Sequence, residues 1–311
     1  MRAFMVSDFG AEGVIGERPI PVPGEGEVRV SIDAAGVNAV DVPMVAGYLK
    51  DFIETRLPLV PGLDLAGTID AIGPGAADFA VGDDVFGSLS KPYFGDGTFA
   101  EYAVASTGHL RHRPAGVDAV TAAALPLSGG TALGLVTAAQ LEPGQVVLIM
   151  GAGGGLGSYA IALAVHAGAR VIAATRGELG DQVRTLGASE VIDYTLGDVA
   201  AAVRTSHPDG IDAIIDSSSD DAALHRLADA LRRGGRLASL SRSLDVEGLA
   251  KRGLIGVKAS GAVDRIAELA ELAAKGLRIP VKTYPLGEAG RALAEQATRQ
   301  VRGKLVLVIR P

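Results

Sequence analysis

Small residues at fixed spacing give this chain its clearest chemistry: Ala152, Gly154 and Gly157 follow an apolar run and open an amphipathic one. A backbone without bulky side chains can turn tightly, come close to a pyrophosphate and let the next helix pack near the strand. Free N–H groups at the helix start, near Gly155 and Leu156, would bind the phosphates, whose charge the helix dipole favours. The spacing therefore predicts a dinucleotide-binding turn.

The segments on either side of this turn have the order that such a site requires. An apolar run at 146–150 comes before it, a helical pattern continues to His166, and a second apolar run follows at 170–175. Strand, glycine turn, helix and strand form the first half of a dinucleotide-binding unit. Because a glycine turn alone is common, this context carries the prediction.

The end of the second predicted strand indicates which dinucleotide would bind. NAD-selective sites have Asp or Glu there, which accepts a hydrogen bond from the ribose 2′-hydroxyl. Here Thr175 and Arg176 stand at that point, and a guanidinium suits the 2′-phosphate of NADPH (NADP). Two alternatives stay open: Arg176 is a solvated loop cation, or the strand runs two residues further and Glu178 favours NADH.

Composition excludes several classes of chemistry and partner. The chain has 311 residues and no cysteine, which excludes disulfides, Cys-ligated zinc, iron–sulfur clusters and thiol nucleophiles. A net charge of -7 argues against nucleic acid, and the G-x-S-x-G motif of hydrolases is absent. The start lacks a basic signal-peptide region and no apolar run approaches roughly 18 residues, so we expect a soluble, cytoplasmic protein without a membrane partner.

The length favours two domains, and the sequence pattern changes near Val120. Before that point, glycine and proline separate short β-branched runs, which predicts an irregular β domain. After it, apolar runs alternate with helical patterns, which predicts a doubly wound parallel sheet. The predicted strands of this sheet are 146–150, 170–175, 190–192, 211–216, 236–240 and 254–257. Near the end, 304–309 is predicted as a strand that can return to the sheet of the first domain.

Motifs along almost the whole chain resemble one superfamily in their order and spacing. They stand at 36–41, 61–67, 81–87, 97–102, 122–126 with 131–132, the glycine turn, 186–188 with 191–194, and 303–306. They resemble the medium-chain dehydrogenase/reductases, and most of all the zinc-independent quinone oxidoreductase branch. The resemblance implies an α/β fold with a GroES-like β-rich catalytic domain over 1–119 and 260–311 and a Rossmann dinucleotide-binding domain over 120–259. It also implies an active site in the cleft between the domains and a homodimer, for which the edge strand at 254–257 is a candidate.

The zinc ligands of the alcohol dehydrogenases in this superfamily have no counterpart here. Those enzymes hold catalytic zinc with a Cys after a Gly-Val pair and a His in a Gly-His-Glu motif. In this chain Asn38 stands in place of the Cys, and Leu63, followed by Asp64, stands in place of the His. Neither side chain is a suitable ligand, so we expect no metal. Without a Lewis acid, the hydride acceptor must already be electrophilic.

The substrate side would need hydrogen-bond donors, because hydride transfer to a conjugated carbonyl compound puts negative charge on the acceptor's oxygen. The resemblance makes Asn38 and Tyr48 the candidate catalytic residues, since Tyr48 matches the family's Gly-x-Tyr position. Either would orient the substrate, and Tyr48 or solvent would supply the proton. Asp41 is the third candidate, expected to fix the loop rather than to act as a base.

Five further residues are candidates for cofactor contact. By resemblance, Thr131 would contact the nicotinamide ribose or phosphate, Tyr194 would lie near the adenine-side phosphate, and Lys304 would approach the cofactor. Ser217 and Ser241 follow predicted strands whose carboxyl ends border the cofactor crevice. The first three also have plain alternatives, as a helix hydroxyl, a half-buried tyrosine and a strand-edge lysine.

The expected function is therefore an NADPH-dependent, zinc-independent oxidoreductase that transfers a hydride to small quinones or α,β-unsaturated carbonyl compounds. One alternative is an enoyl-thioester reductase, against which the lack of an obvious basic patch for the carrier's phosphate counts. The other is a non-catalytic NADP(H)-binding sensor.

Overall fold

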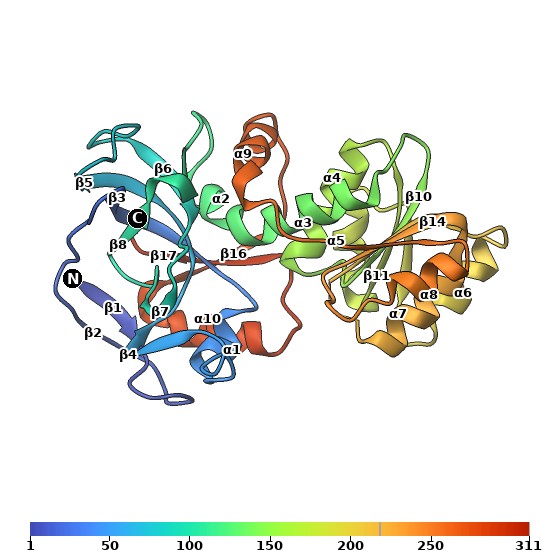
Figure 1. The fold of residues 1–311 in the computed structure, drawn as a ribbon, viewed down its shortest axis with the longest axis horizontal. Helices are drawn as coiled ribbons and strands as arrows, with labels where there is room; N and C mark the ends of the chain where they lie inside the picture. The colour runs from blue at the N-terminus through green and yellow to red at the C-terminus, as the bar shows by residue number, and fades with distance from the viewer. Residues whose placement is uncertain (218, 311) are drawn as a thin grey trace. The chain divides into compact units, whose positions relative to one another are not determined.

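Strands from both ends of the chain form one seven-stranded sheet in the computed structural model, which describes residues 1–217 and 219–310 (Figure 1). Its order is β16-β17-β3-β5-β6-β9, and β8 pairs with β3. The bounds are β3 Glu27–Val37, β5 Asp64–Ile72, β6 Asp84–Ser88, β8 Tyr102–Ser106, β9 Leu110–His112, β16 Val281–Pro285 and β17 Lys304–Val308. β17 lies antiparallel to β3, with Leu305 opposite Val37. The predicted return of the C-terminal strand to the first sheet is therefore confirmed.

Alternation along β3 explains how this sheet buries one of its faces. Val28, Val30 and Ile32 are fully buried, and Arg29 and Ser31 between them are half-buried, because successive side chains of a strand point to opposite faces. The last four residues of β3 are all buried, because helix α2 (Ala119–Ala124) covers the second face there. Both faces of the sheet are therefore closed where β3 ends.

Close packing of α2 on β3 depends on Gly36. A Cβ at this position would lie 2.5 Å from the carbonyl oxygen of Ala123, so a larger residue would push the helix away. Asp118 begins the helix and its carboxylate accepts a hydrogen bond from the Thr121 N–H, a cap worth about 1 kcal/mol. The next helix, α3 (Pro126–Ala139), thereby starts beside the end of β3.

Smaller elements complete this part of the chain. β1 (Arg2–Met5) pairs with β2 (Val14–Glu17), and β4 (Glu54–Val60) pairs with β7 (Tyr93–Asp96). The remaining helices are α1 (Asp41–Val45), α9 (Ile266–Ala274) and α10 (Ala289–Ala297). One hydrophobic core joins side chains of β3, β5, β17 and α10, so the C-terminal segment is part of the same core as the N-terminal strands.

Six parallel strands form the second sheet, in the order β12-β11-β10-β13-β14-β15. Their bounds are β10 Val146–Met150, β11 Arg170–Thr175, β12 Glu190–Asp193, β13 Ile211–Asp216, β14 Leu231–Ser239 and β15 Ile255–Lys258. Counted from β10, this is the order 3-2-1-4-5-6 of a Rossmann sheet. The prediction of an α/β protein with a doubly wound parallel sheet is confirmed, and β10, β11 and β13 have the predicted bounds.

One strand of this sheet begins earlier than predicted. β14 starts at Leu231, although the apolar run begins at 236, because Arg232, Arg233 and Gly234 are exposed members of the strand. Its pairing with β13 shifts register between Ile211 and Ala213. Apolar periodicity cannot detect a strand end that lies in solvent.

The helices of the second sheet differ in how they begin. They are α4 (Gly155–His166), α5 (Gly180–Thr185), α6 (Val199–Ser206), α7 (Asp221–Leu227) and α8 (Val246–Lys251). The carboxylates of Asp198, Asp220 and Asp245 cap α6, α7 and α8 by accepting backbone N–H groups. α4 begins after Gly154, which has no side chain to act as a cap. The first N–H groups of α4 are thus left for another partner.

Contacts divide the chain into two compact units. The first unit comprises 1–130, 263–277 and the residues from 281 onward, and the second comprises 131–262 and 278–280. The predicted domains divide at 119/120 and 259/260, whereas the units divide at 130/131 and 262/263. Within residues 1–217 and 219–310, no helix has the length and apolar character needed to cross a membrane.

Candidate functional site

The glycine turn of the second unit lies between β10 and α4. Gly151 has a φ of 65°, a left-handed conformation that favours glycine. Ala152 is buried, and its N–H donates to the carbonyl oxygen of Ala174 on β11 at 3.1 Å. The sequence interpretation gave the tight turn to Ala152 and missed Gly151 beside it. A glycine directly after an apolar strand is the signal that could have found it.

Two glycines of the turn differ in what surrounds them. A Cβ on Gly157 would lie 2.3 Å from the Gly151 carbonyl oxygen and 2.6 Å from the Ala152 Cα, so the chain itself requires glycine there. At Gly154 the nearest such atom is 3.8 Å away, and a φ of -80° suits any residue. The protein's own packing does not require glycine at 154. A phosphate group against the backbone would require it.

Backbone donors without an acceptor lie at the start of α4. The first helical hydrogen bond runs from the Ser158 N–H to the Gly154 carbonyl oxygen at 2.8 Å. In the part of the chain that the structure describes, the N–H groups of Gly155, Leu156 and Gly157 donate to no acceptor. Free donors at the positive end of a helix dipole bind phosphate. The residues present therefore fit the pyrophosphate of a dinucleotide.

Arg176 and Tyr194 lie together at the ends of β11 and β12. β11 ends at Thr175, whose side chain is buried, and the next residue, Arg176, donates from Nε to the Tyr194 hydroxyl at 3.4 Å. Asp193 Oδ2 accepts the Gly177 N–H at 2.9 Å, which holds the loop after β11 against β12. The structure thus brings three of the predicted cofactor residues to one place.

Glu178 does not lie on the strand. It is exposed in the short helix η2 (Gly177–Leu179), and β11 ends at Thr175, so the condition for its NADH-favouring role is not met. Asp193 was missed by the sequence interpretation. Hydrogen bonds from Thr195, then the Gly177 N–H and the charge of Arg176, lower the pKa of the Asp193 carboxyl below its ordinary value. It therefore stays ionised beside Arg176.

The predicted serines follow two other strands of the same sheet. Ser217 comes after β13 and Ser241 after β14, and both are half-buried. Because parallel strands end at one edge of a sheet, they lie at the same edge as the glycine turn. Asp216, buried at the end of β13, accepts the hydroxyl of Ser239 at 3.2 Å. The sequence interpretation missed Asp216, although an acid that ends an apolar strand is a signal for such a partner.

Thr131 lies on α3 and is half-buried. A Cβ on Gly261 would lie 3.3 Å from the Thr131 hydroxyl, and a Cβ on Gly134 would lie 1.9 Å from the Ser260 carbonyl oxygen. The helix therefore packs tightly on 260–262. Contact of Thr131 with a nicotinamide ribose stays a prediction.

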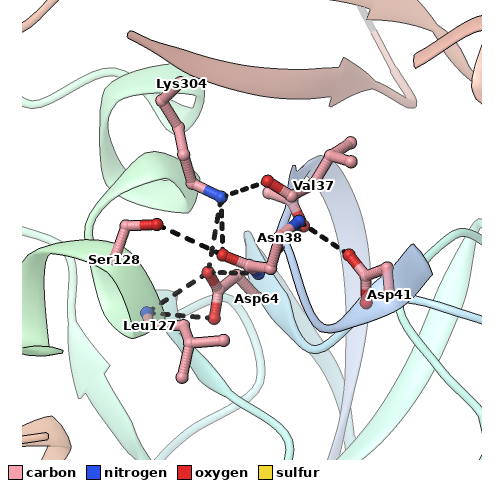
Figure 2. A network of polar contacts seen from close by, with 8 residues as sticks. Val37, Asn38, Asp41, Asp64, Leu127, Ser128 and Lys304 are labelled. Atoms are coloured by element: carbon pink, nitrogen blue, oxygen red, sulfur yellow. Dashed lines mark hydrogen bonds and ion pairs between the residues drawn. The ribbon is translucent and has the colours of Figure 1, made fainter. Parts of the chain in front are cut away.

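A buried polar cluster lies in the first unit, where Asn38, Asp64 and Lys304 meet (Figure 2). Asn38 follows β3, Asp64 begins β5 and Lys304 begins β17, and these are neighbouring strands in the order β17-β3-β5. Lys304 Nζ donates to Asn38 Oδ1 at 2.8 Å and to the Val37 carbonyl oxygen at 2.5 Å, and lies 3.9 Å from Asp64 Oδ2. Asn38 Nδ2 donates to Asp64 Oδ2 at 2.9 Å.

The side-chain amide of Asn38 can have only one orientation in this cluster. Lys304 offers only donors and an ionised Asp64 only acceptors, so Oδ1 must face Lys304 and Nδ2 must face Asp64. The Ser128 hydroxyl donates to the same Oδ1 at 3.3 Å, and Nδ2 also lies 3.4 Å from the Gly36 carbonyl oxygen. Both ends of the amide are therefore bound within the chain.

Asp41 is fully buried beside the cluster, at the start of α1. Its Oδ2 accepts the backbone N–H of Asn38 at 2.7 Å, which fixes the loop after β3. Burial raises the pKa of Asp41 to about 7, although the Asn38 N–H and the charge of Lys304 lower it. This carboxyl therefore changes its charge near neutral pH.

The charges of Asp64 and Lys304 balance each other in the cluster. Burial raises the pKa of Asp64, while the charge of Lys304 and hydrogen bonds from Asn38 and the Leu127 N–H lower it. Burial also lowers the pKa of Lys304, against the charges of Asp64 and Asp41. The Leu127 N–H lies 3.2 Å from both carboxylate oxygens of Asp64. Removing either charge would leave the other buried and unpaired, which is strongly unfavourable.

Tyr48 is not a member of this cluster. It lies in the loop after α1, is 76% exposed, and its hydroxyl has no hydrogen-bond partner within residues 1–217 and 219–310. The structure thus brings together Asn38, Asp41 and Lys304, and leaves the Tyr48 hydroxyl free. Lys304 lies with the substrate-side candidates of the first unit.

Asp64 and Ser128 are members of the cluster that the sequence interpretation did not include among its site residues. Asp64 interrupts an apolar stretch, and a single acid there is a signal for a buried partner. Ser128 carries no such signal. Among the described residues, no three His, Asp or Glu side chains come together as they would to hold a metal ion.

Comparison with known proteins gives two matching family models, the alcohol dehydrogenase GroES-like domain over residues 24–115 and the zinc-binding dehydrogenase over 186–307. A chloroplast quinone oxidoreductase of Triphysaria versicolor is 36% identical over 70% of this chain and 68% of its own length. An NADPH-dependent alkenal/one oxidoreductase of Arabidopsis thaliana is 31% identical over 80% of this chain and 64% of its own. The solved quinone oxidoreductase of Coxiella burnetii superimposes with a TM-score of 0.88 and 27% identity, covering 100% of this chain and 99% of that one.

Proposed function

The chain belongs to the quinone oxidoreductase branch of the medium-chain dehydrogenase/reductase superfamily and is an oxidoreductase, and from that premise we propose that it transfers a hydride from NADPH, without zinc, to quinones or α,β-unsaturated carbonyl compounds. The observation that carries this proposal is the start of α4, where free N–H groups and the open backbone of Gly154 fit a pyrophosphate.

The second unit supplies the residues proposed to hold the cofactor. The N–H groups of Gly155, Leu156 and Gly157 would bind the pyrophosphate, and Arg176 would bind the 2′-phosphate. Arg176 is half-buried and lies beside the ionised Asp193, but its hydrogen bond goes to the neutral Tyr194 hydroxyl from Nε alone. The other N–H groups of its guanidinium can therefore pair with a 2′-phosphate. When bound, reduced nicotinamide supplies the hydride. That one relative is named as NADPH-dependent supports the choice of NADPH.

The first unit supplies the residues proposed for the substrate side. Of the two donors that the sequence suggested, Tyr48 has a free hydroxyl, whereas the N–H groups of Asn38 already donate to Asp64 and Gly36. We therefore assign the hydrogen bond to the acceptor's oxygen to Tyr48. Asn38 would line the substrate side with a side chain that is held in one orientation and donates no hydrogen bond to the substrate.

The absence of a zinc requirement is supported by what lies around Asn38. Its Oδ1, Asp64 Oδ2 and the Val37 carbonyl oxygen surround the ammonium group of Lys304. A divalent ion placed among these oxygens would meet a positive charge within hydrogen-bond distance, which strongly opposes binding.

The test is a steady-state assay with purified protein. NADPH and NADH oxidation is followed by absorbance with a panel of quinones, enones and one enoyl thioester, before and after dialysis against a chelator. We expect NADPH oxidation with quinones or enones that survives chelation. In Tyr48→Phe, turnover should fall while the Kd for NADPH stays within about twofold. Tyr93→Phe, which removes another hydroxyl of the first unit, is the matched control.

Three other outcomes of this assay would each change the proposal. Reduction of the enoyl thioester alone would favour an enoyl-thioester reductase. Tight NADPH binding without turnover on any acceptor would favour a sensor. If the chelator abolished activity and added zinc restored it, the zinc-free mechanism would be contradicted.

We also propose a homodimer that uses the outer edge of β15. This strand is last in its sheet among the described residues, so one row of its backbone N–H and C=O groups has no strand partner there, and Ile255 is 39% exposed. Light scattering should give the mass of two chains, and Gly256→Pro should shift it toward one. The cytoplasmic location stays a prediction.

A further inference from the structure

Lys304 is buried in a place where the fold itself would favour an apolar residue. It is 2% exposed and begins β17, whose next three residues, Leu305, Val306 and Leu307, are fully buried. Taking an ammonium group out of water costs several kcal/mol, and lysine is almost never fully buried unless it is paired. The proposed reaction assigns no task to this residue.

Three oxygens from two neighbouring strands and one loop surround the Lys304 ammonium. They are the Val37 carbonyl oxygen at 2.5 Å, Asn38 Oδ1 at 2.8 Å and Asp64 Oδ2 at 3.9 Å (Figure 2). Carbonyl, amide and carboxylate oxygens are the ligands that hard cations prefer in proteins. The chain has therefore built a cation site and filled it with its own side chain.

We propose that Lys304 is a positioning residue and the built-in cation of the substrate side, which fixes the Asn38 amide and neutralises Asp64 so that the site works without a metal ion. This inference rests on the proposed function, since it assigns Asn38 to the substrate side. It goes beyond the expected contact of Lys304 with the cofactor.

The hydrogen bonds show what Lys304 controls. Without its N–H groups, Oδ1 of Asn38 keeps only the Ser128 hydroxyl as a donor, and the hydrogen bond from Nδ2 to Asp64 is left as the main constraint. The amide is then held less firmly and can turn more easily, so that Nδ2 leaves Asp64. The Ser128 hydroxyl, which donates to the same Oδ1 at 3.3 Å, would lose its acceptor as well. Loss of the ammonium should therefore disturb turnover while leaving the glycine turn of the second unit unchanged.

The experiment is chemical rescue of Lys304→Ala. The substitution leaves a hole among the three oxygens that methylammonium can enter and tetramethylammonium cannot. We expect kcat to fall at least about tenfold, with the Kd for NADPH unchanged within about twofold. Methylammonium chloride should then restore part of kcat and raise the melting temperature of the variant, whereas tetramethylammonium and sodium chloride should not. Lys282→Ala removes an exposed lysine of the adjacent strand β16 and is the matched control.

Two results would overturn the proposal. One is wild-type kcat in Lys304→Ala. The other is a folded variant in which methylammonium restores kcat and the melting temperature no more than sodium chloride does. If Lys304→Ala does not fold, Lys304→Met with Asp64→Asn replaces the ion pair by neutral groups of similar size. We expect that double variant to fold with low kcat, and wild-type kcat in it would reduce Lys304 to a structural role.

Failure of the proposed function gives a different result. A wild-type protein that reduces no acceptor would remove the reductase proposal, while specific recovery of the melting temperature by methylammonium would still support the cation site. The melting temperature therefore tests Lys304 without any turnover.

Discussion

At the start of α4 three backbone N–H groups have no partner within the described residues, whereas around Asn38 both ends of a side-chain amide are bound inside the chain. The glycine turn is open and uncharged. The cluster is closed and holds opposite charges. The first is incomplete until a ligand binds, so changes there should alter affinity more than stability. The second is complete in the free protein, so changes there should alter stability first.

The largest expected effect comes from removing one charge of the closed cluster. Asp64→Ala would leave Lys304 buried without its carboxylate, which should lower the free energy of unfolding by about 3–5 kcal/mol. Asp70→Ala, on the same strand, removes the partner of Arg29, a more exposed pair, and should cost about 1 kcal/mol or less. Urea denaturation of both variants measures the difference. Equal losses would show that the cluster is no more closed than this half-buried ion pair.

Asp41 should make the stability of this unit depend on pH. Because burial raises its pKa to about 7 from the ordinary value of 3.8, the unfolded chain loses the proton first as pH rises. The stability from this group is full below about pH 4 and decreases as pH rises through 7, by up to about 4 kcal/mol.

Asp41→Asn isolates this contribution, because an amide oxygen can still accept the Asn38 N–H while carrying no charge. Denaturation curves from pH 4 to 8 should show that the free energy of unfolding of the variant increases relative to that of the wild type as pH rises. A constant difference between the two proteins across that range would mean that Asp41 does not titrate there.

Substitutions in the glycine turn should mainly change the affinity for NADPH. Gly154→Val places a side chain where the protein has free space, so the melting temperature should stay within about 2 °C of the wild type. The Kd for NADPH should rise about a hundredfold, or ~3 kcal/mol. Gly157→Ala is the contrasting variant: its Cβ would meet the Gly151 carbonyl oxygen, so it should also lose about 1–3 kcal/mol of stability. Calorimetry and thermal melting separate the two effects, and unchanged affinity in Gly154→Val would place the pyrophosphate elsewhere.

The smallest effect concerns the choice of nucleotide. Arg176→Gln should weaken NADPH about tenfold, or ~1.4 kcal/mol, and leave NADH nearly unchanged. Arg184→Gln removes an exposed guanidinium of the second unit that pairs with Asp181, and should change neither Kd. Fluorescence titration gives both values. An unchanged ratio in Arg176→Gln would leave Arg176 as a solvated loop cation.

The same contrast explains what the sequence could predict. The strands β10 and β11 and the turn between β10 and α4 are within 30 residues of each other in the chain, and their apolar runs and glycines are local signals. The predicted bounds of both strands agree with the structure. Elsewhere in the same sheet the exposed start of β14 was missed, because its arginines and glycines do not form an apolar run.

The cluster depends on contacts between distant parts of the chain. Lys304 meets Asn38 across 266 residues and Ser128 meets it across 90, and no local pattern records either contact. Sequence reasoning placed the C-terminal strand in the first sheet but could not give its register, which decides that Lys304 and not Leu305 stands beside Asn38. It therefore assigned Lys304 to cofactor contact and Asn38 to a free donor, whereas the structure joins them.

The position of β17 also sets an order of events during synthesis. Lys304 follows Val37 by 267 residues, so at about 5–20 residues per second a ribosome takes on the order of ten seconds or more to add it. All of 131–262 has emerged by then and can fold, while β3 still presents an unpaired edge and Asp64 has no counter-charge. Because one unit is inserted in the sequence of the other, the buried cluster of Asn38, Asp64 and Lys304 can close only after the inserted unit has been synthesised.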